Sequence, residues 1–327
     1  MKTPARLLFM PETSCIELAK LCKATGDSLR LEILHVLARD SYGVLELSEL
    51  FDVKQSGMSH HLKTLANAGL VTTRREGNSI FYRRSTVLPE EPFATLKHAV
   101  FESVLGLSLS AEQTKRLQAV HQERSKASRQ FFVENADKFR KQQDLIAAYP
   151  SYGPTVAEQV RHLPGNKRSA LEIGPGEGEF LDVLSTAFDE VIAIDNSEAM
   201  LTKARQLGSH QGLRNIEFVL GDTGTLRDFP KRFDCAVVNM VLHHTPSPQQ
   251  IFLDLSAALK SEATLVVTEL CQHNQEWVKE ACGDLWMGFA PEDLDQWAQN
   301  ANLNLGQSSF LALRNGFQIQ IRQFLKP

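Results

Sequence analysis

A glycine-rich turn directly after an apolar run is the feature that most restricts how this chain can fold. The run at 170–173 is typical of a buried strand, and 179–188 has the pattern of a helix. Between them lie Gly174, Gly176 and Gly178. Glycine adopts positive φ and lets a ligand approach the backbone, and the first amides of the next helix then face that ligand. The stretch therefore predicts a strand, turn and helix that bind an anionic or polar small molecule.

Strand and helix patterns alternate along the rest of this C-terminal region, as they do in a doubly wound sheet. Five mostly apolar strands are expected to run parallel, followed by a closing C-terminal hairpin. Their expected ranges are 170–173, 191–194, 216–219, 234–239, 263–268, 308–313 and 317–324. We therefore predict an α/β multidomain protein with a Rossmann-like, doubly wound and mostly parallel sheet in its C-terminal domain.

Several polar residues follow the predicted strands. Asp195 ends a strand 21 residues after Gly174, where a carboxylate can accept hydrogen bonds from both hydroxyls of a ribose. The Gly-x-Gly-x-Gly spacing after Glu172 resembles motif I of class I S-adenosylmethionine (SAM)-dependent methyltransferases. That resemblance implies a pocket for SAM or S-adenosylhomocysteine (SAH), and an unliganded Rossmann-like core is the alternative. The expected lining residues are Glu172, Gly174, Gly176, Gly178, Asp195, Asn196, Met200, Asp222, Thr223 and Asn239.

The N-terminal ninety residues have a different pattern, that of short helices followed by a hairpin. Helices are expected from Thr13 or Ser14 to Ala24, from Asp27 onward, at 44–51 and from about Gln55 to Ala68. On the last of these, one face is apolar, with Met58, Leu62 and Leu65. The opposite face is short, polar and basic, which suits insertion into a major groove. It carries Ser56, Ser59, His60, Lys63 and Asn67, whereas His61 is expected to make a structural hydrogen bond.

Two β-rich runs, 71–75 and 79–84, flank Gly77-Asn78 and predict a hairpin. Its tip and edges carry Arg74, Arg75, Arg83 and Arg84, which are candidates for contact with phosphates or a minor groove. A solvated basic hairpin is the alternative. The chain here resembles the ArsR/SmtB family of winged helix-turn-helix repressors in the order of its helices, its polar recognition-helix face and its basic wing. The match in sequence is most specific at 55–71.

The ArsR/SmtB resemblance implies a homodimer on double-stranded, palindromic operator DNA. The expected DNA contacts are Gln55, Ser56, Ser59, His60, Lys63, Arg74, Arg75 and Asn78. The metal ligands of the family's sensors are missing, because 44–48 has no cysteine and His98 has no partner at usable spacing. No metal site is therefore predicted. Cys15 and Cys22, seven residues apart, are interpreted as buried small hydrophobic residues rather than a thiol pair.

Composition and charge divide the chain. Residues 1–150 carry a net charge of +4 and residues 151–327 one of -8, and a basic half points to nucleic acid. We expect a DNA-binding domain at 1–90, a helical connector and dimerisation region at 91–150, and the SAM/SAH domain at 151–327. The connector offers residues to cover the ligand, namely Arg140, Gln143, Tyr149 and Tyr152. Five scattered cysteines, no signal-peptide pattern and no apolar run of about 18 residues predict a cytoplasmic chain without membrane contact.

The order of modules resembles ArsR-type regulators fused to a methyltransferase-like domain that respond to SAH. This resemblance implies a repressor of methionine- and SAM-cycle genes that SAH, as effector, releases from DNA. SAM remains a possible second ligand. No catalytic residue is assigned, since His243-His244 fit a base and core histidines equally well. The alternative is an active methyltransferase for a small acceptor, such as arsenite or a quinone-like molecule, with a DNA-binding arm.

Overall fold

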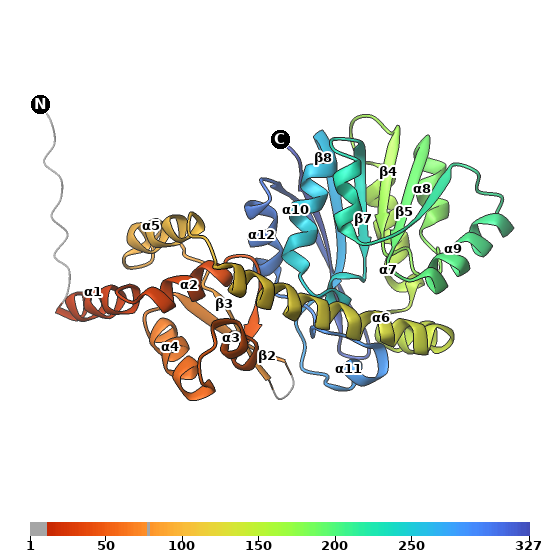
Figure 1. The fold of residues 1–327 in the computed structure, drawn as a ribbon. Helices are drawn as coiled ribbons and strands as arrows, with labels where there is room; N and C mark the ends of the chain where they lie inside the picture. Colours follow the sequence, from red (N-terminus) through yellow and green to blue (C-terminus); the bar gives the residue numbers. More distant parts are fainter. Residues whose placement is uncertain (1–11, 77–78) are drawn as a thin grey trace, which may run out of the picture. The chain divides into compact units, whose positions relative to one another are not determined.

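The computed structural model describes residues 12–76 and 79–327 (Figure 1). Within these residues the chain forms two compact units that divide between Val120 and His121. Each unit has its own hydrophobic core. The segment 91–150, predicted to be a separate connector, contributes to both units.

The N-terminal unit consists of short helices and a small sheet. The helices are α1 (Glu12–Thr25), α2 (Ser28–Val36), α3 (Val44–Phe51), α4 (Gln55–Asn67) and α5 (Ala94–Leu105). The strands are β1 (Tyr42–Gly43), β2 (Val71–Glu76) and β3 (Ser79–Arg84), in the order β1-β3-β2. Asp27 caps α2 by accepting a hydrogen bond of 3.0 Å from the Arg30 N–H, as its sequence position predicts.

The core of this unit forms where α2, α3 and α4 turn their apolar faces toward one another. Met58, Leu62 and Leu65 of α4 are fully buried, which confirms the predicted apolar face. Leu21 and Ala24 carry the buried side of α1, whereas both of its cysteines are exposed. The prediction that Cys15 and Cys22 are buried was therefore wrong, because the heptad spacing places them on the side of α1 away from the core.

A single long helix, α6 (Ala111–Ala147), crosses the division between the units. Its 37 residues correspond to about 55 Å of helix at 1.5 Å per residue. Its start is a capping box, in which the Gln113 N–H donates to Ser110 Oγ and the Ser110 N–H donates to Gln113 Oε1.

The C-terminal unit is built on a seven-stranded sheet. Its strands are β4 (Ser169–Ile173), β5 (Glu190–Asp195), β6 (Ile216–Leu220), β7 (Phe233–Asn239), β8 (Leu259–Leu270), β9 (Asn304–Ala312) and β10 (Gln318–Leu325). The order is β6-β5-β4-β7-β8-β10-β9. Strands β4 to β8 run parallel, and β10 is antiparallel to both β8 and β9. The predicted Rossmann-like sheet with its closing hairpin is confirmed.

The chain order fixes where a ligand can enter this sheet. From β4 the chain moves outward through α8 (Leu181–Ala187) to β5 and through α9 (Glu198–His210) to β6. It then returns to β7 and moves the other way through α10 (Pro248–Ala258) to β8. Because such crossovers are right-handed, α8 and α9 cover one face and α10 the other. The strand order reverses between β4 and β7, and in this class of fold ligands bind at the carboxyl ends of the strands beside such a reversal.

Three further α-helices and two short 3-10 helices complete the described part of the unit. They are α7 (Tyr149–Arg161), η1 (Thr223–Asp228), η2 (Leu242–His244), α11 (Trp277–Cys282) and α12 (Pro291–Asn300). Among the helices of the described residues, none is long and apolar enough to cross a membrane.

Candidate functional site

The three glycines of the turn after β4 all have positive φ, but for different reasons. The angles are 64° at Gly174, 56° at Gly176 and 92° at Gly178. A Cβ on Gly174 would lie 2.5 Å from Val241 Cγ2, and one on Gly178 would lie 3.1 Å from Ala204 Cα. A Cβ on Gly176 would meet no described atom within 4 Å. The outer glycines are therefore needed for packing, and the middle one leaves open space beside the backbone.

Two carboxylates from neighbouring strands are desolvated beside this turn. Glu172 of β4 is 2% exposed, and burial raises its pKa to about 8 against the opposing effect of the Asn239 amide. Burial also raises the pKa of Asp195, at the end of β5, to about 6. The backbone N–H groups of Ser197, Gly176 and Asn196 oppose that rise, and the Ser197 N–H donates to Asp195 Oδ1 at 2.9 Å. Both carboxylates thus lie in a site from which water is largely excluded.

Some buried polar atoms of this site make no well-formed hydrogen bond within the described structure. They are Glu172 Oε2 and both amide atoms of Asn239, although the Asn239 amide lies close enough to Glu172 to lower the pKa of that carboxyl. Buried polar groups are nearly always hydrogen-bonded, because each unsatisfied one costs about 1–3 kcal/mol. A polar ligand bound at the carboxyl ends of β4 and β7 would satisfy them.

The remaining predicted pocket residues are arranged less uniformly. Met200 is buried at the start of α9, while Asn196 is exposed. Asp222 is exposed and accepts a hydrogen bond of 2.9 Å from the Gly224 N–H. Thr223 Oγ1 donates to Asp254 Oδ2 at 2.7 Å, so its hydroxyl is engaged within the protein. The structure therefore brings Glu172, the glycines, Asp195 and Asn239 to one edge of the sheet.

The end of α6 reaches the same turn. Arg140 pairs with Glu177 at 3.2 Å and with Glu179 at 2.6 Å, and Lys203 pairs with Glu177 at 3.1 Å. The Arg140 side chain is 50% exposed, so each pair contributes little to stability by itself. Of the other predicted covering residues, Tyr152 is buried with its ring centroid 5.8 Å from that of Tyr149.

A buried histidine pair lies directly after β7, and the sequence did not reveal its partners. His243 Nδ1 lies 2.5 Å from Glu269 Oε1 of β8, and both side chains are fully buried. Burial lowers the pKa of His243, but Glu269 and Asp284 outweigh this effect and raise it to about 9. Burial and the neighbouring His243 hold the pKa of His244 well below its ordinary value. The sequence signal was Glu269, an acidic residue that follows a mostly apolar run in the second half of β8.

The predicted DNA-binding face of α4 is exposed as expected. Gln55, Ser56, Ser59, His60 and Lys63 are all exposed, and the apolar side of the helix is buried. His61 makes structural contacts instead, since its Nδ1 lies 3.4 Å from Arg30 Nη1 and 3.7 Å from Asp27 Oδ1.

The arginines of the hairpin differ from the prediction. Arg75 is exposed, but Arg74 is only 9% exposed, so its side chain cannot reach a phosphate without a rearrangement. Arg84 packs its guanidinium 4.8 Å from the Phe101 ring centroid and donates from Nε to the Leu34 carbonyl. The predicted contact Asn78 lies outside the described residues. Arg75 thus remains as the exposed arginine of the described wing.

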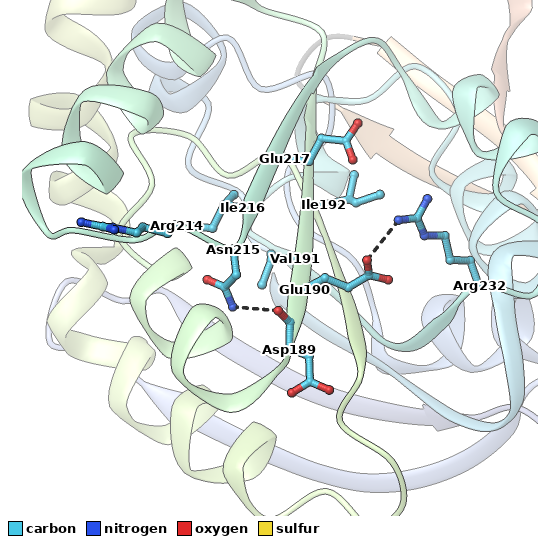
Figure 2. A pocket seen from close by; sticks show the side chains of 9 residues that line it. All are labelled: Asp189, Glu190, Val191, Ile192, Arg214, Asn215, Ile216, Glu217 and Arg232. Atoms are coloured by element: carbon cyan, nitrogen blue, oxygen red, sulfur yellow. Dashed lines mark hydrogen bonds and ion pairs between the residues drawn. The ribbon is translucent and has the colours of Figure 1, made fainter.

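A pocket of about 270 Å³ lies in the C-terminal unit, apart from the glycine turn (Figure 2). Its lining comes from the starts of β5 and β6, with Asn215 and Arg232 at its sides. The amino ends of parallel strands are at the sheet edge opposite the glycine turn. This pocket is therefore separate from the predicted ligand site.

Comparison with known proteins gives two separate matches along the chain. Residues 27–73 match the family model described as bacterial regulatory protein, arsR family. Residues 171–267 match the model described as methyltransferase domain. The arsenical resistance operon repressor of Staphylococcus aureus is 35% identical over 89 residues, which are 27% of this chain and 74% of that repressor.

The C-terminal unit has its own relatives. The ubiquinone biosynthesis O-methyltransferase of Coxiella burnetii is 25% identical over 161 residues, covering 45% of this chain and 68% of that enzyme. A solved structure of a Burkholderia thailandensis 1,6-didemethyltoxoflavin-N1-methyltransferase with bound SAH superposes with a TM-score of 0.52. It is 18% identical and covers 68% of this chain and 93% of that one, which shows a shared fold.

Proposed function

The chain belongs to the ArsR family of bacterial regulatory proteins and carries a methyltransferase domain, and from this premise we propose that it is a repressor controlled by SAH. In this proposal a homodimer binds palindromic operator DNA of methionine- and SAM-cycle genes. SAH binds the methyltransferase domain and releases the DNA. The domain thus acts as a sensor.

The exposed face of α4 supports the DNA-binding part of this proposal. Ser59 and His60 have the size and hydrogen-bonding groups to contact base edges, and Lys63 can contact a phosphate. Arg75, exposed on the wing, adds a second phosphate contact. In a dimer, two such helices would bind half-sites about one turn of DNA apart.

The desolvated edge between β4 and β7 supports the ligand part. Asp195 is suited to accept hydrogen bonds from a ribose diol, and the open space at Gly176 admits the ligand beside the backbone. Glu172 and Asn239 supply buried polar atoms that make no well-formed hydrogen bond with described protein groups. The Burkholderia toxoflavin methyltransferase was solved with SAH bound, which agrees with this choice of ligand.

The course of α6 is the observation on which the sensor interpretation rests. Near its start, Gln113 Nε2 donates to Glu32 Oε2 at 2.8 Å and Arg116 Nη1 donates to the Glu49 carbonyl at 3.2 Å. Near its end, Arg140 pairs with two glutamates of the glycine turn. The helix thus makes bonds within the N-terminal unit near its start and within the C-terminal unit near its end. In this proposal a ligand that moves the glycine turn also moves the end of α6 that is bonded to it.

The test measures binding of SAH and SAM by calorimetry and then operator affinity with each ligand present. A ligand shifts the DNA-binding equilibrium only through its different affinities for the two states. We expect SAH to weaken operator binding more than SAM does, by a coupling of about 1–3 kcal/mol. Operator DNA should weaken SAH binding by the same factor. Operator affinity that is unchanged by saturating SAH would contradict the proposal.

A second candidate is an active methyltransferase for a small acceptor, favoured by the likeness to the Coxiella O-methyltransferase. The two candidates are distinguished with labelled SAM, with and without added arsenite or quinol acceptors. If the chain is a sensor, labelled SAM should not be turned over, whether or not arsenite or a quinol is added. Methylation of an acceptor at an ordinary enzymatic rate, together with an SAH-insensitive operator affinity, would support the enzyme instead.

A further inference from the structure

We propose that the C-terminal unit holds a divalent metal ion of the zinc type, bound by His243, His244 and Asp284. The potential ligand atoms of these three residues all lie within 4.8 Å of one another. His243 is fully buried, His244 is 6% exposed and Asp284 is 3% exposed. This site lies in the methyltransferase domain and does not use the N-terminal positions at which sensors of the ArsR/SmtB family would carry metal ligands.

The donor set has the chemistry of a transition-metal site. Imidazole nitrogen suits zinc, copper, iron and nickel, and two imidazoles with one carboxylate are a common set of three protein ligands. A tetrahedral zinc ion with ligands at about 2.0–2.2 Å places the ligand atoms roughly 3.4 Å apart. The three groups, which lie within 4.8 Å of one another, would move closer together on binding the ion. A water molecule would complete the tetrahedron.

The orientation of His243 is the second, independent observation. Its Nδ1 faces Glu269 Oε1 at 2.5 Å, and the same carboxylate accepts from the His243 N–H at 3.2 Å and from the Leu270 N–H at 2.6 Å. The Glu269 carboxylate is therefore fixed in place. Metal-binding histidines almost always donate their second ring nitrogen to such a carboxylate. His243 Nε2, buried and without a hydrogen-bond partner among the described residues, is left to bind the ion.

Charge also favours a cation here. Glu269 and Asp284 bring two carboxylates to two imidazoles in a buried cluster, and a divalent ion would balance the two negative charges once both imidazoles are neutral. The cluster also touches α6, because Ser128 Oγ donates to the His244 carbonyl at 2.9 Å. Arg124 Nη1 donates to the Pro246 carbonyl at 3.0 Å two residues further on. The ion would thus stabilise the loop after β7, and Arg124 and Ser128 of α6 donate hydrogen bonds to that loop.

The test begins with the full chain carrying Cys15→Ser and Cys22→Ser, which removes the exposed thiols as competing ligands. After chelation and dialysis, zinc is titrated in the presence of a competing chromophoric chelator, and bound metal is measured by elemental analysis. We expect one zinc per chain. With cobalt(II), d–d bands should appear without a thiolate charge-transfer band. A folded chain that binds no zinc, or a strong thiolate band, would overturn the proposal.

Variants assign the ligands. Asp284→Asn and His244→Ala should each lose the equivalent of zinc, whereas His210→Ala, at an exposed histidine of α9, should keep it. Glu269→Gln should keep zinc but weaken its affinity about 10–100-fold, because it orients His243 without binding the ion. Circular dichroism and SAH titration check that each variant is folded. Zinc bound at wild-type stoichiometry and affinity by folded Asp284→Asn would overturn the assignment.

Discussion

The glycine turn allows the effect of a mutation on folding to be separated from its effect on ligand binding. Gly174→Ala and Gly176→Ala both force a residue with a Cβ into positive φ, at a cost of about 1–2 kcal/mol. Only at Gly174 does the new methyl meet the protein, 2.5 Å from Val241 Cγ2, and such overpacking adds about 1–3 kcal/mol. We therefore expect Gly174→Ala to lower the free energy of unfolding by about 2–5 kcal/mol and Gly176→Ala by only about 1–2 kcal/mol.

Ligand affinity should follow the opposite pattern. At Gly176 the methyl would enter space that no described atom occupies and that SAH is proposed to fill. SAH affinity should fall more than tenfold, which is about 1.4 kcal/mol. Gly165→Ala is the matched control, because its φ is also positive, at 88°, and its Cβ would meet no described atom within 4 Å. It lies before β4, at the other edge of the sheet, and should cost stability alone.

The assays are urea unfolding without ligand and calorimetric titration with SAH. Adding Val241→Ala to Gly174→Ala should recover part of the lost stability, and the double-mutant cycle should give a coupling of about 0.5–3 kcal/mol. Equal losses of stability in the Gly174→Ala and Gly176→Ala variants would refute the packing argument. SAH affinity in Gly176→Ala that matches that of Gly165→Ala would show that the ligand does not lie over this turn.

Three further predictions concern charge. Lys63→Ala and Arg75→Ala should each weaken operator binding and reduce the slope of log affinity against log salt by about 1, and unchanged slopes would exclude phosphate contacts. The pKa of Glu172 is raised on folding from 4.5 to about 8, so the ligand-free chain should lose stability as pH rises through this window. Glu172→Gln should abolish that loss in urea unfolding, and an identical pH profile would contradict it. Arg140→Ala should reduce the effect of SAH on operator affinity, whereas Lys138→Ala, exposed on the same helix, should not.

The local elements of this fold could be predicted because the spacing of apolar residues along a short stretch of sequence indicates a helix or a strand. Met58, Leu62 and Leu65 recur at helical spacing, and all three are buried on α4. The strand ends that carry Glu172 and Asp195 follow apolar runs of the right length. A parallel sheet then brings their carboxyl ends to one edge, so the composition of the candidate site also followed from the sequence.

Other features depend on pairings that no local pattern contains. Val71, at the strand end, is the one apolar residue of β2, so the strand has no alternation of apolar and polar residues from which its buried face could be predicted. Arg74 is buried and pairs with Phe81 of β3. His243 and Glu269 are 26 residues apart and meet because β7 and β8 pair in register, with Asn239 opposite Thr268. Asp284 joins them from a loop beyond β8. Sequence spacing alone could not have assembled this cluster.

The unsatisfied polar atoms of Glu172 and Asn239 also bear on how long the protein persists in a cell. Without ligand, the folded chain bears their desolvation cost, and a ligand that binds only the folded chain removes it. At a ligand concentration of 100 times Kd the gain is about 2.7 kcal/mol, which lowers the unfolded fraction roughly 100-fold. Proteases act largely on that fraction. Under the proposed function, SAH would release the repressor from the operator and also slow its degradation. The released repressor would then accumulate, and it would restore repression once SAH is consumed.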